Sequence, residues 1–172
     1  MNTKTMVRIA LIAAIYTVIS LALAPISYGN IQVRIAEALT LLPLIYRPSI
    51  WGITLGCFLT NLIGAMIGVN PTGYLDALIG TSATLIAALI TWHFRNHRIG
   101  KLPVISLLAP VVLNFIFIGV ELAFLLMPDR ILMGTLIFGT EVAVGELISV
   151  ILGYFLVNAL QRTKYFRNEK QQ

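Results

Sequence analysis

Charged side chains are scarce in this sequence. Lysine, arginine, aspartate and glutamate make up 11% of its 172 residues, where a soluble domain has about 25%, and 58% of the residues are hydrophobic. A water-exposed fold of this composition would present large apolar patches, which soluble proteins avoid because such patches associate. Soluble, disordered and collagen-like classes are therefore excluded, and the mean hydropathy of +0.90 predicts a membrane protein.

Residues for covalent, phosphate or metal chemistry are also few. Cys57 is the single cysteine, so it forms no internal disulfide, and its apolar surroundings predict a small buried side chain. Gly100-Lys101 lacks the earlier glycine and the following Ser or Thr of a phosphate-binding loop. His93 and His97 have helical metal-ligand spacing, but without an acidic or cysteine partner nearby we expect no metal site. No serine, histidine and aspartate are expected at a common depth in the membrane, as a catalytic triad would require, so we expect neither catalytic residues nor a cofactor.

Five long runs carry no formal charge: residues 9–33, 48–75, 77–94, 102–120 and 147–161. Each has about the length at which a helix, rising about 1.5 Å per residue, crosses a hydrocarbon core of about 30 Å. A membrane barrel would need alternating polarity, which these runs lack. We therefore predict helices over residues 7–24, 48–69, 75–94, 103–127 and 132–161, and a shorter sixth over 36–46. Residues 1–172 are then one all-α membrane domain.

The beginning of the chain imitates a secretory signal. Lys4 and Arg8 precede an apolar stretch that ends in a small-x-small pattern at residues 22–24. Pro25 follows that pattern directly and helical runs continue beyond it, so we expect the first helix to be retained.

Lysine and arginine indicate the orientation in the membrane. With six crossings and a cytoplasmic N-terminus, ten of the 12 basic residues face the cytoplasm, and only Arg34 and Arg130 lie outside. Both termini are therefore expected in the cytoplasm. The net charge of +5 thus indicates topology and contact with the anionic inner leaflet of the bilayer. The basic residues are scattered over loops and are not interleaved with aromatic residues, so we expect no nucleic-acid partner.

Five acids lie in or beside the predicted helices, and they are Glu37, Asp76, Glu121, Glu141 and Glu146. A charged side chain at the centre of a bilayer costs up to about 3 kcal/mol. All five fall in the outer half, where the base at the same level is Arg34, three residues before Glu37. Internal pairing cannot account for all of them, so we predict a polar cavity that opens outward and binds a cation or paired N–H donors.

Further polar residues lie at similar depth, namely Gln32, Asn61, Asn70, Tyr74 and Asn114. Asparagine and glutamine more often bond neighbouring helices to one another, and a single buried acid can be protonated, so these alternatives stay open. Turn residues followed by alternating polarity in residues 25–43 predict a lid over the cavity or a plain interfacial connector.

Small residues recur every four positions in residues 48–69, at Gly52, Gly56, Thr60, Gly64 and Gly68. Ala10 and Ala14 begin a similar row in the first helix. Such rows let another backbone approach closely, and for the glycine row we favour packing inside the protein.

The segment YGNIQVRIAEAL at residues 28–39, followed by Leu42-Pro43, resembles the signature of the QueT family. The size, the predicted helices and the basic cytoplasmic ends agree with that family over essentially the whole chain. Members are substrate-binding S components of energy-coupling factor (ECF) transporters, assigned to queuosine precursors. The resemblance implies an S-component fold, docking through Ala10 and Ala14 on a transmembrane coupling protein, and energy from two ATPase subunits.

The implied ligand agrees with the acids. A 7-deazaguanine with an aminomethyl arm, or queuine, offers adjacent N–H donors to one carboxylate and a cation to another. The predicted substrate-binding residues are Gln32, Glu37, Tyr74, Asp76, Asn114, Glu121, Glu141 and Glu146. Tyr74, and Tyr28 or Phe138, are the expected platforms for the ring.

Other functions remain open on the sequence. Thiamine is also cationic, so an S component for that vitamin is compatible. A stand-alone proton-coupled carrier would use Glu141 or Glu146 as its protonation site, but the inverted repeat common in such carriers is not detectable. The clustered acids argue against a scaffold without a ligand.

Overall fold

The computed structural model describes residues 2–27 and 33–163, and this part of the chain is built of helices. Five spans are long and apolar enough to cross a membrane. They are α1 (Thr3–Ala22), α3 (Ser49–Met66), α4 (Leu75–His93), α5 (Val104–Leu126) and α6 (Ile131–Arg162), the last with the short η2 (Pro128–Arg130) before it. A single turn, α2 (Ala24–Ser27), follows α1. The five long predicted helices are confirmed, with ends a few residues from those expected.

The shorter predicted helix is present as η1 (Ile35–Leu44), but its backbone is a 3₁₀-helix instead of an α-helix. Pro43 lies inside it and has no N–H to donate. The tighter winding also lengthens the segment, because ten residues at about 2.0 Å each span about 20 Å, against about 15 Å in an α-helix. η1 therefore covers more depth than its residue count suggests.

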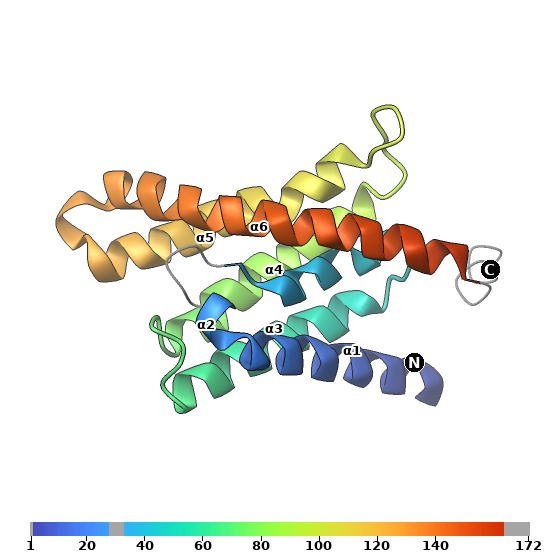
Figure 1. Ribbon diagram of the computed structural model, residues 1–172, viewed down its shortest axis with the longest axis horizontal. Helices are drawn as coiled ribbons and strands as arrows, with labels where there is room; N and C mark the ends of the chain where they lie inside the picture. The colour runs from blue at the N-terminus through green and yellow to red at the C-terminus, as the bar shows by residue number, and fades with distance from the viewer. Residues whose placement is uncertain (1, 28–32, 164–172) are drawn as a thin grey trace.

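η1 lies in the middle of the bundle and contacts all five long helices. These five pack in chain order, α1 on α3, α3 on α4, α4 on α5 and α5 on α6. η1 joins the two ends of this row, since it contacts both α1 and α6 (Figure 1). The main core forms around it, with Leu41 of η1 packed among Tyr16, Ile53 and Val150. Side chains on η1 consequently face every long helix.

Glycines bring the helices close together. A Cβ on Gly52 would lie 2.9 Å from the Ile12 Cβ, and one on Gly56 would lie 2.7 Å from the Tyr16 Cβ. The first two members of the glycine row thus pack against α1, which confirms internal packing at these positions. On α6, a Cβ on Gly153 would collide with the Ala38 carbonyl oxygen of η1.

The bundle has two distinct ends. The start of α1, the η1–α3 and α4–α5 connections and the end of α6 lie together, and we call this the basic end (Figure 1). Its described charges are all basic, at residues 4, 8, 47, 95, 98, 101 and 162. The α5–α6 hairpin extends furthest at the opposite end (Figure 1).

We expect Gly153→Ala to lower the free energy of unfolding by about 1–3 kcal/mol, because the added methyl overlaps the Ala38 carbonyl. The apparent melting temperature in detergent measures the loss. Leu152→Ala is the control, since Leu152 is exposed on the neighbouring face of α6. Equal melting temperatures for Gly153→Ala and the unchanged protein would contradict the close approach of α6 to η1.

Candidate functional site

An ion pair joins η1 to α4 at the centre of the candidate site. Arg34 caps the start of η1, and Asp76 lies in the first turn of α4. The Arg34 Nη2 atom is 2.6 Å from the Asp76 Oδ2 atom, and the Asp76 side chain is 1% exposed. The Ser149 hydroxyl of α6 donates to the Arg34 backbone carbonyl at 2.9 Å. Arg34 is thereby tied to two helices that are distant from it in the sequence.

Asp76 is held in place by its neighbours. The Asn70 Nδ2 donates to its Oδ2 at 3.1 Å, and the Asn61 Nδ2 donates to its backbone carbonyl at 2.9 Å. A Cβ on Gly80 would collide with the Asp76 Oδ1, so the carboxylate rests on the glycine one turn later. Asn61 thus bonds α3 to α4, the structural alternative that its sequence position left open, and Asn70 orients the acid.

Three more acids converge on this pair, each 1–3% exposed: Glu37 of η1, Glu121 of α5 and Glu146 of α6. Glu37 lies within electrostatic range of Arg34 and Asp76. Glu121 is in range of the same two residues, and Glu146 is in range of Glu37 and Arg34. We call Glu37, Asp76, Glu121 and Glu146 the acid cluster. It brings together four of the five predicted acids.

Glu141, the fifth acid, does not join them. It is exposed on the outer face of α6, in a shallow depression with Thr140 and Val144. Residues five apart on an α-helix point about 140° away from each other. Because Glu146 faces inward, Glu141 cannot, and the prediction of a five-acid cavity is corrected to four.

Tyr16 was not predicted from the sequence. It is buried in α1, and its hydroxyl donates a short hydrogen bond to the Glu37 Oε1. A buried tyrosine hydroxyl usually finds a partner, so the one tyrosine of the first helix, within its apolar run, was a signal that could have found it. Through this bond α1, which carries no acid, is also connected to the acid cluster.

Carboxylate oxygens outnumber donors in the acid cluster. Among residues 2–27 and 33–163, five buried oxygens make no hydrogen bond of ordinary geometry, and these are Glu37 Oε2, Asp76 Oδ1, Glu121 Oε1 and Oε2, and Glu146 Oε1. Three neutral side chains lie close enough to interact with these acids, Thr84 with Glu37, Thr72 with Glu121 and Asn114 with Glu146. A buried carboxylate without a partner is strongly unfavourable. Such an arrangement can accept hydrogen bonds from a ligand's N–H groups and offset a positive charge.

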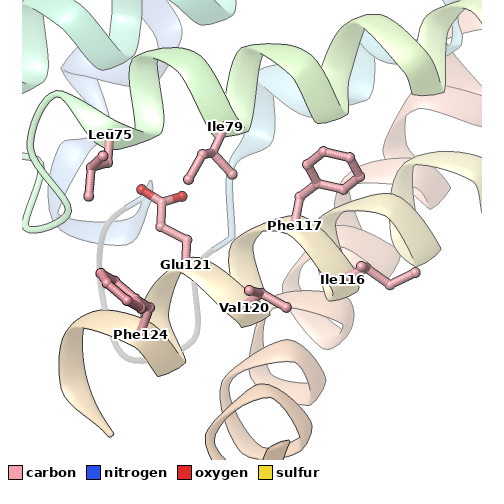
Figure 2. Close-up of a pocket in the computed structure, with 7 residues that line it drawn as sticks. All are labelled: Leu75, Ile79, Ile116, Phe117, Val120, Glu121 and Phe124. Carbon is pink, nitrogen blue, oxygen red and sulfur yellow. The ribbon is translucent and has the colours of Figure 1, made fainter. Parts of the chain in front are cut away.

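Two cavities border the acid cluster. The first lies among Arg34, Asn114 and Glu146, and its volume of about 10 Å³ leaves room for about one water molecule. The second is a groove of about 440 Å³ between α4 and α5, with Glu121 at its floor (Figure 2). Small-molecule sites occupy about 300–1,000 Å³, so the groove has the size of a ligand.

Aromatic side chains flank the floor of the groove. Phe117, Glu121 and Phe124 are four and three residues apart, so they form one stripe along α5. In Figure 2 the Glu121 carboxylate points toward α4, between Leu75 and Ile79. Neither phenylalanine was predicted from the sequence, although their spacing from Glu121 was a signal that could have found them. The groove thus combines apolar walls with one carboxylate.

The expected ring platforms lie elsewhere. Tyr74 is 61% exposed just before α4 and does not line the groove. Phe138 packs against Ile118 and Val142 in a small apolar cluster. Gln32 and Tyr28, with most of the polar part of the predicted lid, lie outside the described residues.

A sequence profile of the QueT transporter matches residues 6–162. The chain belongs to the QueT transporter family. A relative from Lactococcus lactis subsp. cremoris (strain MG1363), named "Queuosine precursor transporter QueT", is 27% identical over 170 residues, which cover 92% of this chain and 93% of the relative. No solved structure gives a significant match. The resemblance to the QueT family is therefore confirmed.

Membership of the QueT family also settles the class of protein. Together with the five apolar spans, it makes this chain a multi-pass integral protein of the bacterial cell membrane. The family is one of transporters, so the buried acids lie in a protein that moves a solute.

In this QueT-family protein we expect Arg34→Gln to lower the free energy of unfolding by about 3–5 kcal/mol, because it leaves buried acids without their base. Asp76→Asn should be milder, since Arg34 keeps Glu37 and Glu146 within electrostatic range. Thermal unfolding in detergent measures both. The double variant should lose less free energy of unfolding than the sum of the two single losses. Strictly additive losses would show that the Arg34–Asp76 pair contributes no coupling energy.

Proposed function

We propose that this chain is the S component of an ECF transporter and that it binds a queuosine precursor from outside the cell. The acid cluster carries the proposal, because its buried oxygens lack donors and Glu121 borders a groove of ligand size. The name of the L. lactis relative, a queuosine precursor transporter, supports this class of substrate. The fold supports a binding role, since η1 presents Arg34 and Glu37 to the helices that carry the other acids.

The ligand chemistry follows from the groove. A 7-deazaguanine places a ring N–H beside an exocyclic NH₂, and these two donors match the two carboxyl oxygens of Glu121, which make no hydrogen bond of ordinary geometry within the described residues. Phe117 and Phe124 offer apolar surface to the ring. The cationic aminomethyl arm is attracted by the remaining negative charge of the acid cluster, with Asn114 beside Glu146 as a further polar contact. Glu37, Asp76, Asn114, Glu121 and Glu146 are thus the substrate-binding residues of this proposal.

We place six crossings in residues 1–172, with both termini in the cytoplasm. η1 is the sixth crossing. Although it has only ten residues, its 3₁₀ geometry gives it a length of about 20 Å, which supports this assignment. The start of α1 and the end of α6 lie at one end of the bundle, which supports an even number of crossings (Figure 1). The basic charges at that end support its cytoplasmic location.

Uptake then needs a partner, because the sequence has no phosphate-binding loop of its own. Ala10 and Ala14 are exposed on α1, on the side away from the buried Tyr16. We assign this surface to the transmembrane coupling protein, which two ATPase subunits drive. Small side chains permit the close helix contact that docking within a membrane requires.

We expect Glu121→Gln to weaken binding of aminomethyl 7-deazaguanine by about 10–100-fold, because it removes a charged acceptor of two hydrogen bonds. Isothermal titration calorimetry on the purified protein measures this. Asp129→Asn is the matched control, since Asp129 is an exposed acid in η2. The site assignment fails if both variants bind aminomethyl 7-deazaguanine like the unchanged protein. Tighter binding of thiamine than of the 7-deazaguanine would instead identify thiamine as the substrate.

We expect Ala10→Trp combined with Ala14→Trp to abolish co-purification with the coupling protein while ligand affinity stays unchanged, because two indoles block close helix contact. Ala159→Trp, at an exposed alanine of α6, is the control. Retained co-purification would contradict the docking surface. Uptake into proteoliposomes without ATP or partners, driven by a pH gradient, would favour the stand-alone carrier instead.

A further inference from the structure

Two arginines meet one tryptophan at the basic end. The Arg95 guanidinium carbon lies 3.7 Å from the centre of the Trp92 ring, and that of Arg47 lies 5.9 Å away. Arg95 Nη1 also donates to the Trp92 carbonyl at 3.0 Å, which fixes its position. Within the described parts of the chain, neither guanidinium pairs with a carboxylate. Their positive charge is therefore available to an anion from outside the protein.

A pocket of about 220 Å³ adjoins this charge, between the start of α3, the end of α4 and the first turn of α1. Arg47 lines it together with apolar residues that include Trp51 and Leu89. The Trp51 side chain is 59% exposed and Leu89 is 47% exposed, and both belong to helices long and apolar enough to cross a membrane. The pocket thus joins an apolar wall to a cationic rim at the level where tryptophan prefers to lie.

We propose that this pocket binds an anionic phospholipid, with the phosphate on Arg47 and Arg95 and an acyl chain along Trp51 and Leu89. Guanidinium groups form paired hydrogen bonds to phosphate oxygens. Basic pockets between transmembrane helices are suited to anionic headgroups, whereas a zwitterionic headgroup lacks the net negative charge that two arginines attract. The site is separate from the acid cluster, and it does not depend on which solute the protein carries.

The two tryptophans of the chain, Trp51 and Trp92, both lie at this site, so their fluorescence reports on it directly. Brominated lipids quench a tryptophan that they touch. In phosphatidylcholine vesicles we expect brominated phosphatidylglycerol to occupy the site about five- to thirty-fold more readily than brominated phosphatidylcholine at the same mole fraction. The quenching ratio of the two lipids cancels direct effects of a mutation on tryptophan emission.

Arg47→Gln combined with Arg95→Gln should bring this ratio close to one. The matched control is Arg98→Gln with Lys101→Gln, which removes the same charge from the neighbouring loop, where Arg98 bonds the Lys101 carbonyl; it should keep most of the preference. Unchanged elution on gel filtration checks that the variants fold.

Three results would overturn the proposal. Equal quenching by both lipids in the unchanged protein would show no anionic site. An equal loss in the control and the test variant would assign the preference to the overall charge of the basic end. Displacement of the brominated phosphatidylglycerol by soluble glycerol phosphate would show that the pocket takes a free phosphate and not a lipid.

Discussion

Four acids share one arginine in the interior of this membrane protein, and the rest of the structure depends on that imbalance. Arg34 pairs with Asp76 at 2.6 Å, while Glu37 of the same η1 segment, Glu121 of α5 and Glu146 of α6 surround the pair. In a medium without water, each unpartnered carboxylate is costly, so such a cluster persists where it has a use. In the proposed function, a cationic ligand with N–H donors would supply both the missing hydrogen bonds and the missing positive charge.

The central helix makes this arrangement possible. η1 contacts all five long helices, and glycines such as Gly153 let α6 approach its backbone closely. One short segment therefore presents Arg34 toward α4 and Glu37 toward α1, where Tyr16 donates to it. The side chains that hold η1 and those that define the site belong to one network, so stability and ligand binding are linked through the same residues.

The long helices were predictable because their boundaries follow from where charge is absent, a property of sequence alone. The convergence of the acids was predictable only in part. Helical periodicity could have excluded Glu141, since it lies five residues before Glu146, and could have found Phe117 and Phe124 beside Glu121. The Arg34–Asp76 pair spans 42 residues and depends on how η1 packs against α4, which local spacing does not determine.

The central claim is that surplus buried negative charge selects a cationic ligand, and the charge of the ligand tests it most directly. Aminomethyl and hydroxymethyl 7-deazaguanine have nearly the same shape, but only the first is cationic. The affinities of both for the purified protein can be compared by calorimetry in one buffer. We expect at least about tenfold tighter binding of the aminomethyl form. Equal or tighter binding of the hydroxymethyl form would contradict it.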